Sequence, residues 1–486
     1  MTDRFGDDLP IRELSTLAAA IPDEATLAVS GFGSVGYPKA VPLELADAAR
    51  DGRDLSLTVV SGGSVGEEID VALVEANAID RRYPYQARPP ARDAVNDGAI
   101  AFHDRNISTL GDEVQHGRLC DPDIAIVEAA AVGEGWLVPT TSIGLTPAFV
   151  AAADGLIIEV NEAVPTELET LHDIYVRDPP PDRGPLPLTD PIERIGSSRL
   201  AFDPDTLLGI VPTDRRDESY EFREPTPDDL GIAENLVGFL RDELEDTSVF
   251  DDRLALQFGV GSLGNALMGA IESVAFGDRD LYYFGEVIQD GLLDLLDDDR
   301  LEGASATSLA LSADGQDRLF ADIEAYNDAV VLRPGDVSND PALIDRFGVV
   351  GVNSALETDV YGHVNSTHID GRRVINGIGG SGDFNRNAFL SIVVFPATAA
   401  GGEISRVVPL TPHVDHTEHD VDVFITERGV ADCRGLSPRE RAETIVGECA
   451  HPDYHPELEE YLERAADRGG HIPHDMDSCL DFHRSR

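Results

Sequence analysis

Apolar, β-rich runs alternate with segments of helical periodicity along this 486-residue chain, and no other sequence feature restricts its fold as strongly. One example is TLAVSGFG (26–33), which is followed by PKAVPLELADAAR (38–50). Another is LALQFGVG (254–261), which is followed by NALMGAIESVA (265–275). Strands that alternate with helices in this way are typical of a parallel sheet covered by helices. The sequence therefore predicts an α/β fold.

Chain length and internal similarity predict two domains. A single hydrophobic core rarely grows beyond about 250–300 residues, and the two strand, glycine loop and helix patterns lie in different halves of the chain. Between them, charge and proline replace the apolar pattern at 214–229 (DRRDESYEFREPTPDD). We therefore predict two similar domains, 1–224 and 225–486, each a mainly parallel sheet with flanking helices.

A helix is predicted to begin at the end of this charged stretch. Thr226 is a suitable N-cap, Pro227 suits the first helical position, and Asp229 completes a capping box. The residues with helical spacing that should form its buried stripe are Ile232, Leu236, Leu240 and Leu244.

The chain is strongly acidic, with 91 Asp and Glu against 37 Lys and Arg, and Lys39 is its only lysine. The net charge of -54 repels polyphosphate, so neither nucleic acid nor an anionic membrane is expected as a partner. Because the acids are spread along the whole chain, we attribute them to a halophile-like source and not to the reaction.

The cysteine spacing and the lengths of the apolar segments predict the cellular location of the protein. The four cysteines (Cys120, Cys433, Cys449 and Cys479) form no CxxC pair, which argues against structural zinc or a disulfide framework. The N-terminal MTDRFGDD has no apolar core. The most apolar stretches are shorter than the about 20 residues that span a bilayer. We expect a soluble, cytoplasmic protein.

Three glycine loops invite a nucleotide-binding interpretation: GFGSVG (31–36), GVGSLG (259–264) and GIGGSGDF (377–384). The first two match GxGxxG, but neither is followed by a clear acidic residue in the ribose-binding position, which disfavours a dinucleotide-dependent dehydrogenase. A tight structural turn and an amide-lined site for an acyl group or CoA remain as alternatives.

A histidine cluster, PHVDHTEHD (412–420), has the spacing of metal ligands. It contains His413, His416 and His419 beside Asp415 and Asp420. Alternating His, Asp and Glu residues just before an apolar run are also typical of a solvated loop. We prefer that interpretation and predict no metal.

Glu286 follows the apolar run LYYF (281–284) and precedes a turn and a helical segment. In an open parallel sheet, ligands bind at the carboxyl ends of the strands. A carboxylate there is a candidate nucleophile or base.

Several strings resemble the acetyl-CoA hydrolase/transferase family of class I CoA-transferases, in order from about residue 26 to the C-terminus. They are SGFGSVGYPKAVP, RRYPYQ, DIAIVEA, EVNEAVPTELETLHDIY, QFGVGSLGNAL, FGEVIQD, SND, NSALETDVYGHVNST, INGIGGSGDF, ITERGVADCRGLSPRERA and AHPDY. The segments at 413–442 and 471–483 resemble the branch of succinyl-CoA:acetate CoA-transferases in particular. This resemblance makes the histidine cluster a loop of the family.

The resemblance implies a role for each matching residue. Glu286 matches the catalytic glutamate that carries CoA as a glutamyl thioester, and Asn339 of SND matches a polar group placed against the reacting carbonyl. Gly380 matches an oxyanion-hole glycine, and Glu427 matches a second active-site acid. The positions implied as walls of the acyl-CoA site are Gly259, Val260, Gly261, Gly379 and Gly380.

Three positions depart from the family pattern. Gly285 stands where serine or threonine is usual, Arg428 where tyrosine is usual, and Cys433 where leucine is common. Arg428 could alter what the acyl pocket accepts. The family's carboxylate-binding arginine falls near Arg215 and Arg216, and no motif selects one of them.

The implied function is a CoA-transferase that moves CoA between a short-chain acyl-CoA and a carboxylate such as succinate or acetate. CoA and acyl-CoA would be substrates, with no tightly bound cofactor and no metal, and a homodimer is common in the family. Acetyl-CoA hydrolase activity on the same scaffold is the main alternative. A catalytically silent CoA-binding regulator is a further one.

Overall fold

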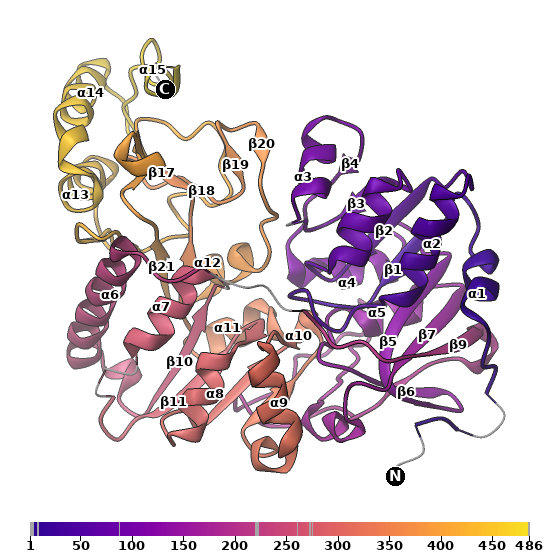
Figure 1. Cartoon of the computed structure of the whole chain (residues 1–486). Helices are drawn as coiled ribbons and strands as arrows, with labels where there is room; N and C mark the ends of the chain where they lie inside the picture. Colours follow the sequence, from indigo (N-terminus) through magenta and orange to yellow (C-terminus); the bar gives the residue numbers. More distant parts are fainter. Residues whose placement is uncertain are drawn as a thin grey trace. The chain divides into compact units, whose positions relative to one another are not determined.

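The strand, glycine loop and helix patterns predicted in both halves of the chain are present in the computed structural model (Figure 1). The structure describes residues 4–6, 9–86, 88–218, 223–259, 261–271, 274 and 276–484. Unit 1 comprises Met1–Glu221 and Tyr282–Leu343, and unit 2 comprises Phe222–Leu281 and Ile344–Arg486. Helices flank mainly parallel sheets in both units, which confirms the α/β class. Each unit is defined by packing and combines two separate segments of the chain. The predicted division into two continuous domains, 1–224 and 225–486, is a different property and stays a prediction.

Among its described residues, unit 1 contains a nine-stranded sheet. Strands β4, β3, β2, β1, β5, β7 and β9 lie in this order and are parallel, whereas β6 is antiparallel to β5, and β8 pairs with β6 in an antiparallel arrangement. The bounds are β1 (Thr26–Val29), β2 (Leu57–Ser61), β3 (Ile79–Tyr83), β4 (Ala101–Phe102), β5 (Ile124–Gly133), β6 (Trp136–Pro139), β7 (Gly155–Asn161), β8 (Leu200–Ala201) and β9 (Leu207–Thr213).

Helices cover both faces of this sheet (Figure 1). Their bounds are α1 (Leu14–Ala20), α2 (Ala40–Arg50), η1 (Glu68–Leu73), α3 (Pro89–Asn96), α4 (Ile107–Gln115), α5 (Thr146–Ala152), η2 (Thr166–Leu171) and η3 (Pro204–Thr206). Strand β1 shows how the faces are separated, because successive side chains of a strand point to opposite sides. Leu27 and Val29 pack into the core beneath α1 and α2, whereas Ala28 packs into the core beneath α4 and α5.

Residues 282–343 add a second parallel arrangement to unit 1. Strand β13 pairs with β11 and with β15, and β12 pairs with β14. The bounds are β11 (Asp280–Phe284), β12 (Val287–Ile288), α8 (Asp290–Asp297), β13 (Gly303–Ala306), β14 (Ser308–Leu309), α9 (Ala313–Ala321), η5 (Ile323–Tyr326), β15 (Val330–Leu332), α10 (Gly335–Ser338) and α11 (Pro341–Arg346). The chain passes from one unit to the other within β11 and within α11.

Unit 2 has a parallel sheet in the order β10, β16, β21 and β25, with β26 antiparallel beside β25. These strands are β10 (Arg253–Phe258), β16 (Val350–Ser354), β21 (Leu390–Val394), β25 (Val423–Ile425) and β26 (Val430–Asp432). Short ribbons are formed by β17 (Glu357–Asp359), β18 (Val364–Asn365), β19 (His368–Ile369), β20 (Arg373–Val374), β22 (Thr398–Ala399), β23 (Ile404–Ser405) and β24 (Val407–Val408).

The helices of unit 2 include the one predicted after the charged stretch. The bounds are α6 (Pro227–Asp246), η4 (Ser248–Phe250), α7 (Ser262–Ile271), α12 (Ser381–Asn387), η6 (Ala400–Gly402), α13 (Pro438–Cys449), η7 (Pro452–Tyr454), α14 (His455–Arg468) and α15 (Asp481–Arg484). Helix α6 begins with the predicted capping box of Thr226 and Asp229, and its predicted apolar stripe is buried. Among the described residues, no helix has the length and apolar character needed to cross a membrane.

Candidate active site

Glu286 lies at the carboxyl end of β11, where the sequence predicted a strand to end, and its side chain is partly buried. Its backbone carbonyl accepts hydrogen bonds from the amides of Thr307 at 2.9 Å and Ser308 at 3.1 Å. Both donors follow β13, the neighbouring parallel strand. Glu286 is therefore held between two strand ends, at the edge of the sheet where ligands usually bind.

Asn339 is the side chain that orients the Glu286 carboxylate. Its Nδ2 donates to Glu286 Oε1 at 3.0 Å. Asn339 is fully buried at the C-cap of α10, and this helix is anchored by the amide of Gly335, which donates to the carbonyl of Gly144 at 2.8 Å. Within unit 1, the structure thus joins two residues that the sequence resemblance selected independently.

Gly285 departs from the family pattern for a steric reason. A Cβ atom at this position would lie 2.5 Å from the hydroxyl oxygen of Tyr283, which is far closer than real Cβ contacts. Burial, followed by the charge of Glu286, raises the pKa of Tyr283, so this hydroxyl stays neutral beside the carboxylate. The glycine makes room for a tyrosine beneath the nucleophile segment.

The first glycine loop (31–36) packs against the segment that follows Glu286. Gly33 adopts a φ of +69°, and a Cβ there would lie 3.2 Å from Ser308 Oγ and 3.4 Å from Val287 Cγ2. Phe32 and Val35 join Val287 in one small apolar cluster. The loop is a tight turn that approaches the site closely, and the sequence showed the glycines without showing this neighbour.

A buried charge cluster lies behind this loop. Lys39 Nζ is 2.6 Å from Glu128 Oε1 and 2.8 Å from Asp217 Oδ1, and all three side chains are at most 2 % exposed. Asp217 Oδ2 also accepts from the amide of Gly36 at 3.1 Å, which fixes the end of the loop. Lys39 is therefore the central cation of a site-supporting network.

The pKa values in this cluster follow from burial and from one cation facing two carboxylates. Burial lowers the pKa of Lys39, but the charges of Asp217 and Glu128 outweigh it and raise this pKa above its usual value. Burial also raises the pKa of Glu128, to about 7, with Asp217 adding to the rise and Lys39 opposing it. Lys39 therefore stays charged at neutral pH.

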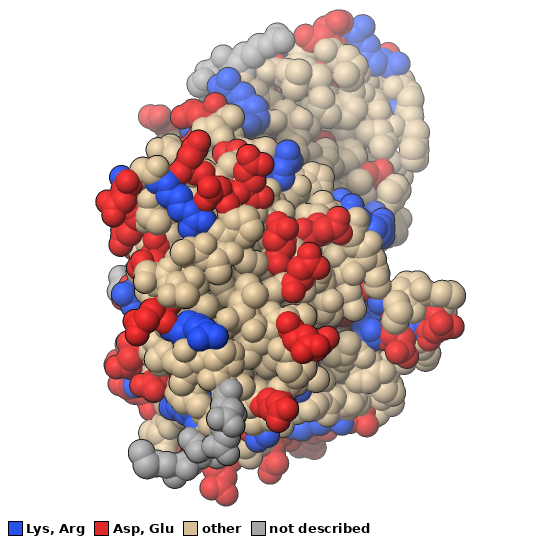
Figure 2. All heavy atoms as spheres, turned by 90° about the vertical axis from the view of Figure 1, so that its right-hand side faces the viewer, with Lys and Arg blue, Asp and Glu red and all other residues tan. Residues whose placement is uncertain are grey.

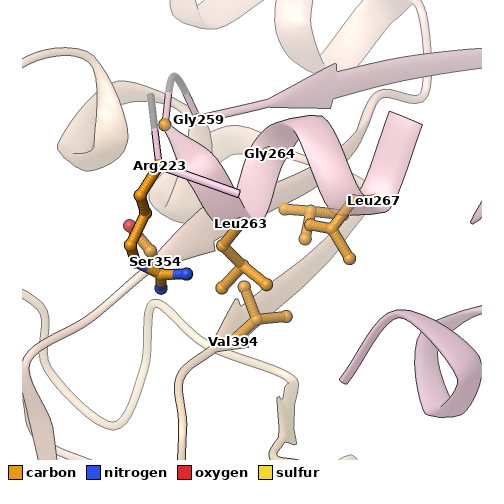
Figure 3. A pocket seen from close by; sticks show the side chains of 9 residues that line it. Arg223, Gly259, Leu263, Gly264, Leu267, Ser354 and Val394 are labelled. Atoms are coloured by element: carbon orange, nitrogen blue, oxygen red, sulfur yellow. The ribbon is translucent and has the colours of Figure 1, made fainter. Parts of the chain in front are cut away.

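Unit 2 has its own cluster of predicted site residues, at the carboxyl edge of its parallel sheet. A pocket of about 200 Å³ opens there (Figure 3). Its lining residues are Arg223, Gly259, Gly261, Leu263, Gly264, Leu267, Val352, Ser354 and Val394. The predicted residues Gly259 and Gly261 are thus pocket walls, whereas Val260 lies outside the described residues. The volume is below the about 300–1,000 Å³ of pockets for drug-sized ligands, so it suits a short acyl or carboxylate group.

Arg223 provides the cationic side chain of this pocket, and Figure 3 shows it extending past Gly259 towards Ser354. Its guanidinium pairs with Asp229, which completes the capping box of α6. Burial raises the pKa of Asp229, but hydrogen bonds from Arg223 and Thr226 outweigh it and hold this pKa below its usual value. The α6 N-terminus thereby positions the arginine.

The arginines suggested from the sequence have other contacts. The backbone amide of Arg215 donates to Asn161 Oδ1 at 3.2 Å, and Arg216 forms an exposed ion pair with Asp317. Arg223 lies only a few residues later in the same charged stretch, but no motif distinguished it. Its partnership with the capping-box residue Asp229 is the signal that could have selected it.

A network of buried side-chain amides lies beside the carboxyl ends of the unit 2 strands. Asn353 Nδ2 donates to Gln257 Oε1 at 3.1 Å and to Asn385 Oδ1 at 2.9 Å, and all three residues are buried. Asn353 Oδ1 lies 3.5 Å from where a Cβ of Gly259 would be. Because Asn385 belongs to α12, the network links the glycine loop after β10 to the helix that begins after Gly380.

Gly380 is the N-cap of α12 and is buried. Helix α12 leads into β21, and a helix that connects parallel strands runs antiparallel to them, so its N-terminus lies at the carboxyl edge of the sheet. Gly379 has a φ of +57°, a conformation that favours glycine. Both predicted glycines therefore lie at the ligand-binding edge of unit 2, and the backbone geometry of Gly379 is one that favours glycine.

Glu427 follows β25 at this same edge, and its side chain is 9 % exposed. Its Oε2 accepts from the amide of Ala397 at 2.8 Å, and its Oε1 accepts from Arg428 Nε at 3.0 Å. Arg428, the departure from the family's tyrosine, thus supplies a counter-charge to the predicted second acid.

The sequence predicted that the histidine cluster is a solvated loop. The structure corrects this prediction for part of the cluster. The side chain of His419 is 82 % exposed, but His416 is only 1 % exposed. The reason is that the backbone of His416 pairs with Val364 of β18, which turns this part of the loop inward. Among the described residues, no group of three or more His, Cys, Asp or Glu side chains is arranged to hold a metal.

Comparisons with known proteins identify the family of the chain. Residues 11–194 match the model of the acetyl-CoA hydrolase/transferase N-terminal domain, and residues 315–462 match the model of the C-terminal domain. The chain is 41 % identical over 469 residues to a succinyl-CoA:acetate CoA-transferase of Clostridium kluyveri, covering 96 % of this chain and 87 % of that protein. It is 38 % identical over 475 residues to a propanoyl-CoA:succinate CoA transferase of Escherichia coli, covering 96 % of each.

Hydrolases are among the relatives as well. An acetyl-CoA hydrolase of Candida glabrata is 40 % identical over 477 residues, covering 93 % of this chain and 89 % of that protein. Among solved structures, a 4-hydroxybutyrate CoA-transferase from Porphyromonas gingivalis aligns with a TM-score of 0.62 at 21 % identity, covering 94 % of this chain and 97 % of that one. At that identity, the structural likeness concerns the fold.

Proposed function

Because the chain belongs to the acetyl-CoA hydrolase/transferase family, we propose that it is a CoA-transferase that exchanges CoA between a short-chain acyl-CoA and a carboxylate such as succinate or acetate. The observation that supports this most directly is the hydrogen bond from Asn339 to Glu286 at the end of β11. A carboxylate that accepts from a fixed, buried donor is oriented for repeated nucleophilic attack.

In the proposed reaction, a carboxylate oxygen of Glu286 attacks the acyl-CoA carbonyl carbon. The C–S bond breaks, leaving a mixed anhydride and the CoA thiolate. The thiolate then attacks Cδ of Glu286, which releases the first carboxylate and forms a glutamyl-CoA thioester. An incoming carboxylate reverses these steps to give a new acyl-CoA and free Glu286. The acyl energy is conserved in covalent intermediates, so the exchange needs no tightly bound cofactor.

In the proposed reaction, Asn339 has a chemical role in addition to orienting Glu286. Thiolate attack on Cδ places negative charge on the oxygen of Glu286 that faces the asparagine amide, where Nδ2 is already within 3.0 Å. Such a preorganised donor contributes about 3–4 kcal/mol of transition-state stabilisation in known oxyanion holes. From the family resemblance, we assign the amide of Gly380 to the oxyanion of the acyl carbonyl and Glu427 to the second active-site acid.

The experiment that tests the transferase function follows the loss of acetyl-CoA and the formation of a second acyl-CoA, with and without succinate. We expect acetyl-CoA consumption to rise by at least about tenfold on addition of succinate, with formation of succinyl-CoA and ping-pong kinetics, because the glutamyl-CoA intermediate waits for a carboxylate. Acetyl-CoA loss that is equally fast without any acceptor, and that yields free CoA, would instead identify an acetyl-CoA hydrolase. The hydrolases among the relatives make this the second candidate function.

Arg223 is proposed to bind the substrate carboxylate in the unit 2 pocket. In a chain of net charge -54, an anionic substrate needs a local cation, and Arg223 lines a pocket of suitable size. We expect Arg223→Gln to raise KM for the carboxylate about tenfold with a smaller change in kcat, because it removes ground-state binding. The matched control is Arg216→Gln, which removes an exposed arginine paired with Asp317. Equal KM values in the two variants would exclude the assignment.

The setting in which the enzyme works is also a proposal. Acidic side chains are spread over the face shown in Figure 2, with fewer basic ones between them, and we infer a halophilic protein. Free cysteines and CoA substrates suit a reducing cytoplasm, and the family suggests a homodimer. The acceptor assay at about 0.2 M and about 2 M KCl tests the adaptation to salt, because salt screens the repulsion between acidic side chains. Light scattering at the same two KCl concentrations tests the homodimer. A monomer that is most active in the lower salt would contradict them.

A further inference from the structure

The peptide between Gly379 and Gly380 is the central peptide of a tight turn over residues 378–381. The amide of Ser381 donates to the carbonyl of Ile378 at 3.3 Å, which closes the turn. Gly379, the first central residue of the turn, has a φ of +57°, which favours glycine, and Gly380, the second, has φ, ψ of -89°, -2°. The hydrogen bond that closes such a turn leaves the N–H of the central peptide unused. The direction of the Gly380 N–H is therefore determined by the conformation of the turn.

Two side chains reinforce this turn. The hydroxyl of Ser381 donates to the same Ile378 carbonyl at 2.7 Å, and Ser381 Oγ lies 3.3 Å from His416 Nε2. A carbonyl oxygen can only accept, so the single hydroxyl hydrogen of Ser381 is directed to Ile378. In the contact with His416, the hydroxyl oxygen must then accept, which requires the hydrogen of the neutral imidazole to be on Nε2.

The surroundings of His416 keep the ring fixed and neutral. The residue is 1 % exposed, and its backbone is bound to Val364 in both directions, at 2.8 Å and 3.2 Å. Burial lowers its pKa against the opposing charges of Asp415 and Asp420, with Arg386 adding to the decrease. A buried, neutral N–H donor with a fixed backbone is well suited to hold a hydroxyl in one orientation.

We propose that His416 is a positioning residue for catalysis: it holds the Ser381 hydroxyl, which closes the 378–381 turn and thereby sets the direction of the Gly380 N–H. The inference rests on the proposed function, in which this amide stabilises the acyl oxyanion. From the sequence, neither a metal nor a substrate was assigned to the histidine motif. The proposal gives one of its residues, His416, a specific structural role.

The test compares His416→Leu, which removes the N–H, with His416→Gln, whose amide nitrogen can replace it. We expect His416→Leu to lower kcat about 10- to 100-fold, the usual cost of losing an orienting partner, with KM for acyl-CoA within about twofold of wild type. His416→Gln should recover kcat to within about threefold of wild type, because a neutral donor and not an acid or base is needed. Thermal unfolding of each variant is measured alongside.

The matched control is His419→Leu, which removes an exposed histidine from the same loop and should leave kcat unchanged. Equal kcat in the His416→Leu and His419→Leu variants, equal loss in His416→Leu and His416→Gln, or a rise in KM alone would each overturn the role of His416. If His416→Leu does not fold, Ser381→Ala decides, and a kcat within about twofold of wild type overturns the proposal. Absence of any acyl-CoA turnover by the wild-type enzyme would instead overturn the proposed function and this inference with it.

Discussion

Replacing Glu286 by glutamine is expected to lower kcat for acyl-CoA turnover by at least about 10⁴-fold, as for other enzymes that lose their covalent nucleophile. The amide is nearly isosteric with the carboxylate, so Asn339 and the β11 strand end should keep their geometry. Borohydride reduction of the enzyme incubated with acyl-CoA provides a second measurement. The wild type should be modified at Glu286, and the variant should remain unmodified.

The matched control is Glu302→Gln. Glu302 is an exposed glutamate that directly precedes β13, at the opposite end of the strand that neighbours β11. Its replacement removes the same charge from the same sheet without touching the carboxyl edge, and we expect wild-type kcat. Full activity of Glu286→Gln, or borohydride labelling at another residue, would refute the assignment of the nucleophile.

Replacing Lys39 by methionine is expected to cause a large loss of stability in unit 1. Methionine has a similar length but no charge, so Glu128 and Asp217 would remain buried without their cation. Removing one partner from a buried ion pair costs roughly 3–5 kcal/mol. For a unit of this size, such a loss lowers the Tm by roughly 10 °C. Calorimetry or circular dichroism measures it.

Two further variants interpret this result. Arg50→Met removes an exposed cation from the far end of α2, the helix that follows Lys39. Arg50 pairs there with exposed Asp47, and its loss should cost less than about 1 kcal/mol. Adding Glu128→Gln and Asp217→Asn to Lys39→Met removes the uncompensated charges and should restore part of the Tm. Equal Tm values for Lys39→Met and Arg50→Met would show that the buried cluster contributes little.

The sequence was sufficient for the features that depend on local patterns. The alternation of apolar runs and helical periodicity predicted the α/β class, and the capping box of Thr226 and Asp229 predicted the start of α6. The position of Glu286 after an apolar run predicted a strand end. Each of these properties is determined by residues within about one helical turn or one strand length of each other.

Features built from distant segments were not predictable in the same way. The partners Lys39 and Glu128 are 89 positions apart, and Gly36 and Asp217 are 181 apart, so no periodicity connects them. The burial of His416 depends on a pairing with Val364 that only the folded chain makes. Likewise, the return of residues 282–343 to unit 1 depends on tertiary packing, because the apolar pattern continues unchanged across both crossing points.

The burial of the only lysine also determines how the protein surface reacts with its own substrates. Thioesters and mixed anhydrides transfer acyl groups to unprotonated primary amines, and lysine ε-amines are the usual acceptors on proteins. Lys39 is buried, ion-paired and held in its charged form, whereas arginine side chains stay protonated under all ordinary conditions. The folded chain thus exposes no lysine amine that could be acylated by the activated intermediates it is proposed to handle.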